Sequence, residues 1–131
     1  MTTKVFSVLL LSTFLLSLGC QGDGKYPVSG QVTWEGESIP EDHNGHVQFM
    51  PVDESVTPDA GPIGADGRFE FRASPGEKRV EILISRPKGK VIEAMGMAAQ
   101  VQYVPERYNK KTELTATVEK SNNEFQFDLV K

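Results

Sequence analysis

Both histidines of this sequence, His43 and His46, lie in one short polar segment that also holds Asp42. A carboxylate beside two imidazoles is a donor set that a transition metal can use. Aspartate, asparagine and glycine also favour turns, and the segment 41–46 contains all three. If His46 begins a strand and His43 lies in the turn before it, the two rings do not point to one centre. The sequence therefore predicts a solvated turn here and no metal site.

Four further carboxylates could do chemistry. Asp53, Glu54 and Asp59 offer the oxygen ligands that calcium prefers, but they lack the spaced acidic positions of a calcium-binding loop. We interpret them as part of a solvated acidic loop. Asp66 precedes Gly67, and this pair is typical of tight turns, so Asp66 is predicted to be a turn residue rather than a catalytic acid.

No arrangement of nucleophile, base and orienting acid is apparent along the sequence. The motif Gly-x-Ser-x-Gly is absent. The chain has a single cysteine, Cys20, which argues against cysteine-ligated zinc and iron–sulfur clusters. We therefore predict no catalytic residue and no cofactor, and a hydrolase-like activity ranks third among the functional hypotheses.

Three aromatic residues, Trp34, Tyr103 and Tyr108, are the candidate ligand contacts. Aromatic faces stack on sugar rings, and they also fill protein cores. Trp34 continues the alternation of Val28 and Val32, which indicates a core position. Tyr103 and Tyr108 flank a proline, and we expect them to be partly exposed. The three rings support a second hypothesis, a carbohydrate-binding module.

The first 19 residues have the parts of an export signal. Lys4 gives the start a positive charge, the run 5–18 is uncharged and largely apolar, and a small residue, Gly19, precedes Cys20. The apolar run is too short for a stable membrane-spanning helix, which needs about 20 residues. We therefore predict a signal peptide over residues 1–19.

The segment 15–20, with the sequence LLSLGC, resembles the lipobox of bacterial lipoproteins, although Ser17 stands where leucine is favoured. The resemblance implies that Cys20 becomes the mature N-terminus and carries acyl chains such as palmitate. Two or three chains anchor a protein stably, and residues 20–27 then form a lipidated tether. The alternative is an ordinary signal peptide cut nearby, which leaves Cys20 as a free thiol.

Composition places the mature chain among acidic globular domains of ordinary size. The 131 residues include 14 basic and 18 acidic side chains, and removal of residues 1–19 takes away only Lys4, which leaves a net charge of -5. An acidic chain without basic clusters is a poor partner for nucleic acid. The length of residues 20–131 suits one domain with one modest core.

Alternation of apolar and polar residues predicts β-strands along the rest of the chain. The clearest hairpin has Asp66-Gly67 in its turn, and the run 79–85 is predicted to be the central strand. The segment 88–99 is predicted to form a short helix or a broad loop. About seven short strands indicate an all-β fold, an antiparallel sandwich. The other predicted strands cover 28–34, 46–50, 101–103, 114–118 and 125–129.

Four short motifs follow one another along the chain, 28–36 (VSGQVTWEG), 47–51 (VQFMP), 65–69 (ADGRF) and 75–76 (PG). Their order resembles a known family, the carboxypeptidase regulatory-like, transthyretin-like domain. The resemblance implies a prealbumin-like β-sandwich over residues 28–131, but no single activity, because one fold hosts many functions. The connection 38–45 is longer and more acidic than the family pattern. The ending of the chain, which includes 103–109 (YVPERYN) and 125–129 (FQFDL), is similar to that of small lipoproteins of planctomycete bacteria.

These observations predict a non-enzymatic, lipid-anchored protein of the bacterial cell envelope that acts as an accessory or adhesive module. Its expected partners are the membrane, through Cys20, and another envelope protein or polysaccharide. The residue after the cysteine is Gln21 rather than aspartate, and in this respect the chain resembles lipoproteins sorted to the outer membrane.

Replacing the lipidated cysteine tests the anchor. Cys20→Ser should move the protein from the membrane fraction to the soluble fraction, because the thioether that carries the lipid cannot form. Circular dichroism of the soluble variant should show an intact β-fold. A variant that still sediments with membranes would contradict the lipobox interpretation.

Overall fold

The computed structural model describes residues 22–131, so the predicted signal peptide and Cys20 lie outside the described residues. Within residues 22–131 no helix is long and apolar enough to cross a membrane. The described residues form eight strands and one short 3-10 turn. These are β1 (Tyr26–Trp34), β2 (Asn44–Pro51), β3 (Asp59–Ile63), β4 (Arg68–Ala73), β5 (Gly76–Ile92), β6 (Met97–Gln102), η1 (Glu106–Tyr108), β7 (Thr115–Val118) and β8 (Glu124–Leu129).

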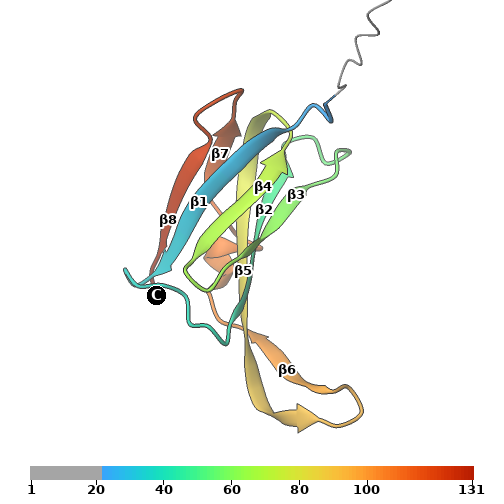
Figure 1. The fold of residues 1–131 in the computed structure, drawn as a ribbon, viewed down its shortest axis with the longest axis vertical. Coiled ribbons are helices and arrows are strands. Elements are labelled where there is room, and N and C mark those ends of the chain that lie inside the picture. Colours follow the sequence, from blue (N-terminus) through green and yellow to red (C-terminus); the bar gives the residue numbers. More distant parts are fainter. Residues whose placement is uncertain (1–21) are drawn as a thin grey trace, which may run out of the picture.

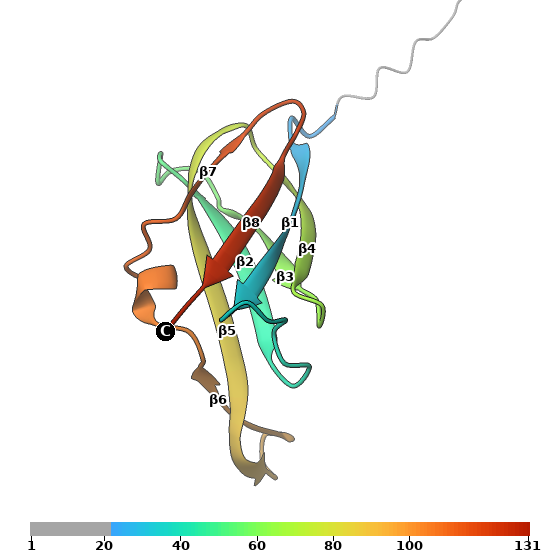
Figure 2. The same ribbon diagram turned by 90° about the vertical axis from the view of Figure 1, so that its left-hand side faces the viewer.

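The strands form a curled mixed sheet in the order β6-β5-β2-β3-β4-β1-β8, with β7 paired to β5. Strands β8, β1 and β4 cover one side of the core, and β2, β5 and β7 cover the other (Figure 1). The all-β sandwich is therefore confirmed. The sheet is not purely antiparallel, because β8 runs parallel to β1 (Figure 2). These two strands are neighbours in space but not in sequence, so no hairpin turn constrains their relative direction.

Period-two alternation selects the side chains of the core. Val32 and Trp34 on β1 point inward, as Val80, Ile82 and Ile84 do on β5. The inward position between Val28 and Val32 is Gly30. A Cβ atom there would lie 2.5 Å from the Phe69 ring and 2.2 Å from the carbonyl oxygen of Phe125, so only glycine fits.

The predicted hairpin around Asp66-Gly67 is confirmed. Gly67 has a φ of 78°, a conformation that glycine adopts without steric cost. The Asp66 carboxylate accepts a hydrogen bond of 3.0 Å from the backbone N–H of Arg68, as expected for a turn residue. The backbone N–H of Val32 on β1 donates to the Gly67 carbonyl and so joins the hairpin turn to β1.

The prediction of a helix or broad loop over 88–99 was wrong. Strand β5 continues to Ile92 and pairs with β6, with a register shift between Lys88 and Val91. The backbone N–H groups of Met95 and Gly96 both donate to the Ile92 carbonyl and close the hairpin. Almost every side chain of this hairpin is exposed on both faces, so no buried face imposed the period-two pattern that identifies a strand.

Asp59 does not belong to a solvated loop, in contrast to the sequence prediction. It is only 5% exposed, and its Oδ1 atom lies 2.6 Å from Lys25 Nζ. Its Oδ2 atom accepts hydrogen bonds from the backbone N–H and hydroxyl of Ser74, at 2.8 and 3.1 Å. Lys78, also buried, donates to the Ser74 hydroxyl. This cluster ties the start of the described chain to β3 and to the turn between β4 and β5.

The ionic cluster sets the pKa of Asp59. Burial on its own raises that pKa, but the hydrogen bonds from Lys25 and Ser74 together outweigh burial and hold the pKa below its usual value. The carboxylate is therefore ionised at neutral pH and stabilises the fold only in that form.

Asp59→Asn should lower the free energy of unfolding at pH 7 by about 1–3 kcal/mol, because charge-assisted hydrogen bonds are lost. The folded pKa lies below the unfolded value of about 3.9, so the stabilisation is complete above that pH and is lost as pH falls through the folded pKa. Urea unfolding from pH 7 downward should show the difference from wild type shrinking below about pH 4. The exposed control Glu54→Gln should have little effect, and a loss independent of pH would contradict the assignment.

Candidate functional site

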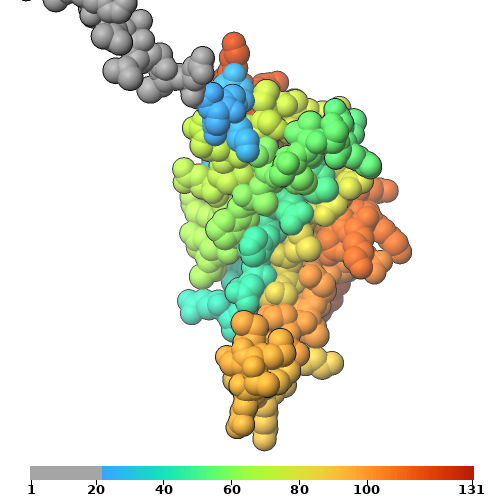
Figure 3. Space-filling view, turned by 90° about the vertical axis from the view of Figure 1, so that its right-hand side faces the viewer, coloured from blue at the N-terminus to red at the C-terminus, as the bar shows by residue number. Residues whose placement is uncertain are grey.

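A hairpin stands clear of the sandwich at one end of the molecule, and we call residues 86–102 the arm. Along β5 alternate side chains are buried from Lys78 to Ile84, whereas every side chain from Arg86 to Ile92 is exposed. The arm lies at the opposite end from the start of the described chain (Figure 1), and it forms a separate knob below the body (Figure 3). It therefore contributes little to the core.

The arm carries most of the exposed large apolar side chains of the described residues. Val91 is 62% exposed, Ile92 43%, Met95 65% and Met97 55%, and these are four of the seven such side chains in residues 22–131. Exposure of apolar side chains to water is unfavourable, and a group of them on one projecting element is a common feature of interaction surfaces. Methionine in particular adapts its shape to a partner.

One face of the arm combines apolar and basic side chains and is continuous with Tyr103 at the base of the arm. Because side chains alternate along β6, Met97, Ala99 and Val101 share a face, and the same alternation continues to Tyr103. Lys88 pairs with Ala99 and Arg86 with Val101, so these two cations lie on that same face. We call it the apolar-basic face.

The arm differs in charge from the acidic body. Arg86, Lys88 and Lys90 make no ion pair with any residue of the described chain, and Glu93 in the turn is the arm's single acidic residue. Unpaired cations beside apolar side chains favour a partner surface that carries carboxylates.

A hollow of about 580 Å³ lies where the arm joins the body, and we call it the basal hollow. The Tyr103 ring centroid lies 5.3 Å from that of Trp34 and 4.3 Å from that of His43. The Arg86 guanidinium lies 5.7 Å from the Tyr103 ring centroid, a cation–π distance. The hollow thus combines aromatic walls with two cations. It is lined by Trp34, Arg86, Gln102, Tyr103, Val104, Pro105 and Lys131.

The three aromatic candidates do not form one exposed platform. Trp34 and Tyr108 are each only 9% exposed and belong to the core, as predicted for Trp34. The Tyr108 hydroxyl donates to the carbonyl of Val130 and accepts from its N–H, at 3.1 and 2.9 Å. Tyr103 is half-buried and, with Trp34, lines the basal hollow. Arg86 and Lys131, which complete that hollow, were not singled out by sequence reasoning.

His43 and His46 do not converge. His43 lies in a turn, as predicted, since its N–H donates to the Pro40 carbonyl, but its side chain is only 7% exposed rather than solvated. Its Nδ1 atom lies 2.6 Å from Asp42, and its buried Nε2 atom has no hydrogen-bond partner among the described residues. His46 is exposed on β2. In residues 22–131 no three histidine, aspartate or glutamate side chains are grouped to hold a metal.

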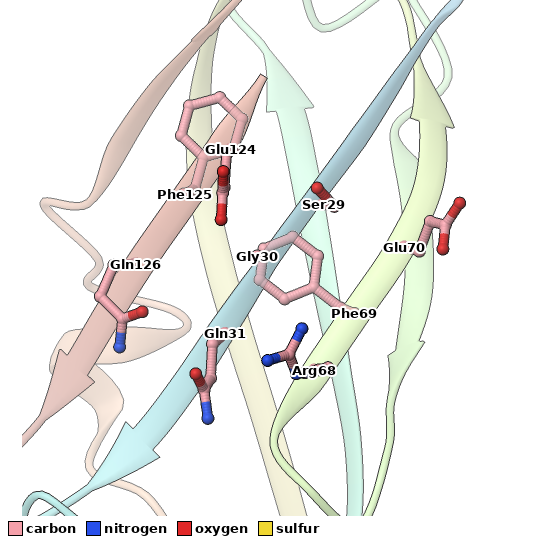
Figure 4. A pocket seen from close by; sticks show the side chains of 9 residues that line it. All are labelled: Ser29, Gly30, Gln31, Arg68, Phe69, Glu70, Glu124, Phe125 and Gln126. Atoms are coloured by element: carbon pink, nitrogen blue, oxygen red, sulfur yellow. The ribbon is translucent and has the colours of Figure 1, made fainter. Parts of the chain in front are cut away.

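A second, smaller hollow of about 240 Å³ lies over strands β8, β1 and β4 (Figure 4). Glu70 and Glu124 both pair in register with Ser29, so they flank it from opposite strands. The Glu70 side chain points away from β1, and the two carboxylates therefore do not converge on one point (Figure 4). This surface lacks the paired geometry of a general acid and base.

Comparison with known proteins finds no matching protein-family model and no matching curated protein. Among solved structures, a DUF3823 family protein from Parabacteroides merdae has 15% identity and a TM-score of 0.38, over 81% of this chain and 44% of that one. A 9R-lipoxygenase from Cyanothece has 12% identity and a TM-score of 0.35, over 82% of this chain and 16% of that one. This chain thus spans less than half the length of either structure.

The two tyrosines should respond differently to removal of the hydroxyl. Tyr108→Phe should lower the free energy of unfolding by about 1–2 kcal/mol, because the Val130 N–H loses its acceptor and the Val130 carbonyl keeps only the Arg107 side chain as a donor. Tyr103→Phe should change it little, since the Tyr103 hydroxyl bonds to no described residue. Denaturant unfolding of both variants gives the comparison, and equal losses would contradict the assigned roles.

Proposed function

We propose that this protein is a non-enzymatic, lipid-anchored binding module of the bacterial cell envelope, and that it binds another envelope protein through the arm. The observation that carries the proposal is the arm itself. Strand β5 extends beyond the last buried position, Ile84, to present apolar side chains outside the core. Extra strand length that buries nothing within the chain is explained if a partner covers it.

The position of the proposed anchor supports this arrangement. The ion pair of Lys25 with Asp59 fixes the chain five residues after Cys20, at the end of the body opposite the arm (Figure 1). A lipid on Cys20 would attach the protein at that end and leave the arm free to reach a neighbour. Attachment to one membrane also raises the effective concentration of the two partners.

The chemistry of the arm indicates the kind of partner. Met97, Ala99 and Val101 offer apolar contact, and Arg86 and Lys88 on the same face offer positive charge. We therefore propose a protein surface that combines apolar side chains with carboxylates. A sugar polymer would require an open aromatic platform, and the burial of Trp34 and Tyr108 does not favour that alternative.

The resemblance to the carboxypeptidase regulatory-like, transthyretin-like domain remains a proposal about kinship. The motifs that carry it fall at strands and turns of the observed β-sandwich, including the 65–69 hairpin turn and the 75–76 turn before β5. Localisation to the outer membrane, suggested by Gln21, belongs to the same proposal.

Photo-crosslinking on native membranes tests the proposed role. A benzophenone amino acid at Met95, in the arm, should give one discrete protein adduct on irradiation, because the arm is covered by a partner. The same amino acid at exposed Lys120, in the turn between β7 and β8, is the matched control and should give none. The absence of an adduct from Met95, or the same adducts from both positions, would contradict the proposal.

A further inference from the structure

Strand β6 is an unusually open edge. It ends the strand order of the sheet, and its sequence Met97-Ala-Ala-Gln-Val-Gln102 contains no charge and no proline. Edge strands are commonly protected by such residues against pairing with another chain. The other end of the strand order, β8, carries Glu124 and Asp128. Of these two edges, β6 alone is thus suited to accept a further strand.

The hydrogen bonding of β6 shows which backbone groups are free. The N–H of Tyr103 donates to the carbonyl of Ile84 on β5 at 2.7 Å. In an antiparallel ladder alternate residues bond to the same neighbour, so Val101 and Ala99 also face β5. Ala98, Gln100 and Gln102 therefore direct their N–H and carbonyl groups to the open side. Pro87, opposite Gln100, fits this pattern because it has no N–H to donate.

We infer that the partner of the arm is a second copy of this chain, paired β6 to β6 in antiparallel orientation about a two-fold axis at Gln100. The inference rests on the proposed role of the arm. In this register Ala98 bonds to Gln102 of the second copy, and Gln100 to Gln100 of the second copy. The backbone N–H and carbonyl groups of all three outward-facing residues then have hydrogen-bond partners on both strands. Each copy uses the same surface, as in the isologous interface of a two-fold dimer.

The same register joins the two apolar-basic faces. Ala99 lies opposite Val101 of the second copy, and Met97 lies opposite Tyr103 of the second copy. These are non-hydrogen-bonded pairs, in which side chains approach most closely. A methionine sulfur against an aromatic ring is a favourable contact. The pairing therefore covers Met97 on each copy and leaves Val91, on the opposite face of the arm, exposed.

The register also brings the tip of each arm to the basal hollow of the other copy. Tyr103, which lines the hollow, lies three residues from Gln100, or about 10 Å at the usual rise along a strand, and Met97 lies equally far on the other side. The turn with Glu93 and Met95 extends beyond Met97. Met95 then meets aromatic walls, and Glu93 approaches the cations Arg86 and Lys131 of the second copy.

This fit favours a second copy over an unrelated protein. The tip supplies an apolar side chain and a carboxylate, and the basal hollow supplies aromatic rings and two cations, so the chain carries both halves of the contact. The arms pair edge to edge in the order β5-β6-β6-β5, so two strands lie between Lys88 of one copy and Lys88 of the other, which limits repulsion. Because the register is antiparallel, the two anchored ends lie at opposite ends of the dimer, so the dimer lies along the membrane surface when both copies are anchored in one membrane.

Cysteine crosslinking of the full-length chain on its membranes tests this register. Gln100→Cys places two thiols on the two-fold axis in a pair with Cα atoms about 5.5 Å apart, within reach of a disulfide. The matched control Ala98→Cys lies on the same face and edge, but its two copies are about 14 Å apart. Mild oxidation should convert most of Gln100→Cys to a reducible dimer, and should leave Ala98→Cys and the wild type, with Cys20 alone, monomeric.

Adding Met97→Asp to the Gln100→Cys variant should abolish the dimer, whereas adding Val91→Asp, on the opposite face of the arm, should not.

The outcomes separate the two proposals. A monomeric Gln100→Cys, or equal dimer from Ala98→Cys, overturns the second-copy inference. If Met95 then still crosslinks to a different protein, the proposed binding role stands and its partner is that protein. If Met95 gives no adduct either, both the inference and the proposed role are wrong.

Discussion

Strand β5 is the constraint on which the rest of the structure depends, because one run of 17 residues belongs to both the body and the arm. It pairs with β7 over 76–79, with β2 over 78–85 and with β6 over 85–92. Its first half belongs to the core, where the side chains of Val80, Ile82 and Ile84 are buried. The direction of the arm is thereby set by the sandwich, since the backbone of β5 continues from one into the other. A surface held this way meets a partner with little loss of conformational freedom.

Two groups of side-chain contacts fix the opposite ends of the body, one ionic and one aromatic. At one end the buried carboxylate of Asp59 ties Lys25 to Ser74, which determines where the chain enters the sandwich. At the other end Tyr103 packs against Trp34 and His43, and Arg86 lies over its ring. The proposed anchor and the proposed contact surface are thus separated by the length of the body. Such separation suits a module that is held at one end and binds at the other.

The sequence predicts the body well and the arm poorly, for a physical reason. Inward residues such as Val32 and Ile82 alternate with polar ones because one face of each strand is buried, and that alternation is readable. In the arm both faces are exposed, so Val91 and Met97 carry no periodic signal. The burial of Asp59 depends on Lys25, which is distant in sequence, and Arg86 and Lys131 line the same hollow only in the folded chain. Contacts of this kind leave no local pattern.

Hydrogen–deuterium exchange of β6 tests most directly the claim that the arm is covered by a partner. The amides of Ala98, Gln100 and Gln102 face the open edge and should exchange rapidly in the soluble Cys20→Ser protein at low concentration. In the anchored wild-type protein on its membranes, the same amides should be protected, while the exchange of β2 and β5 in the core stays unchanged. Rapid exchange of β6 in both preparations would contradict the account, because it would mean that the edge stays open where a partner is expected.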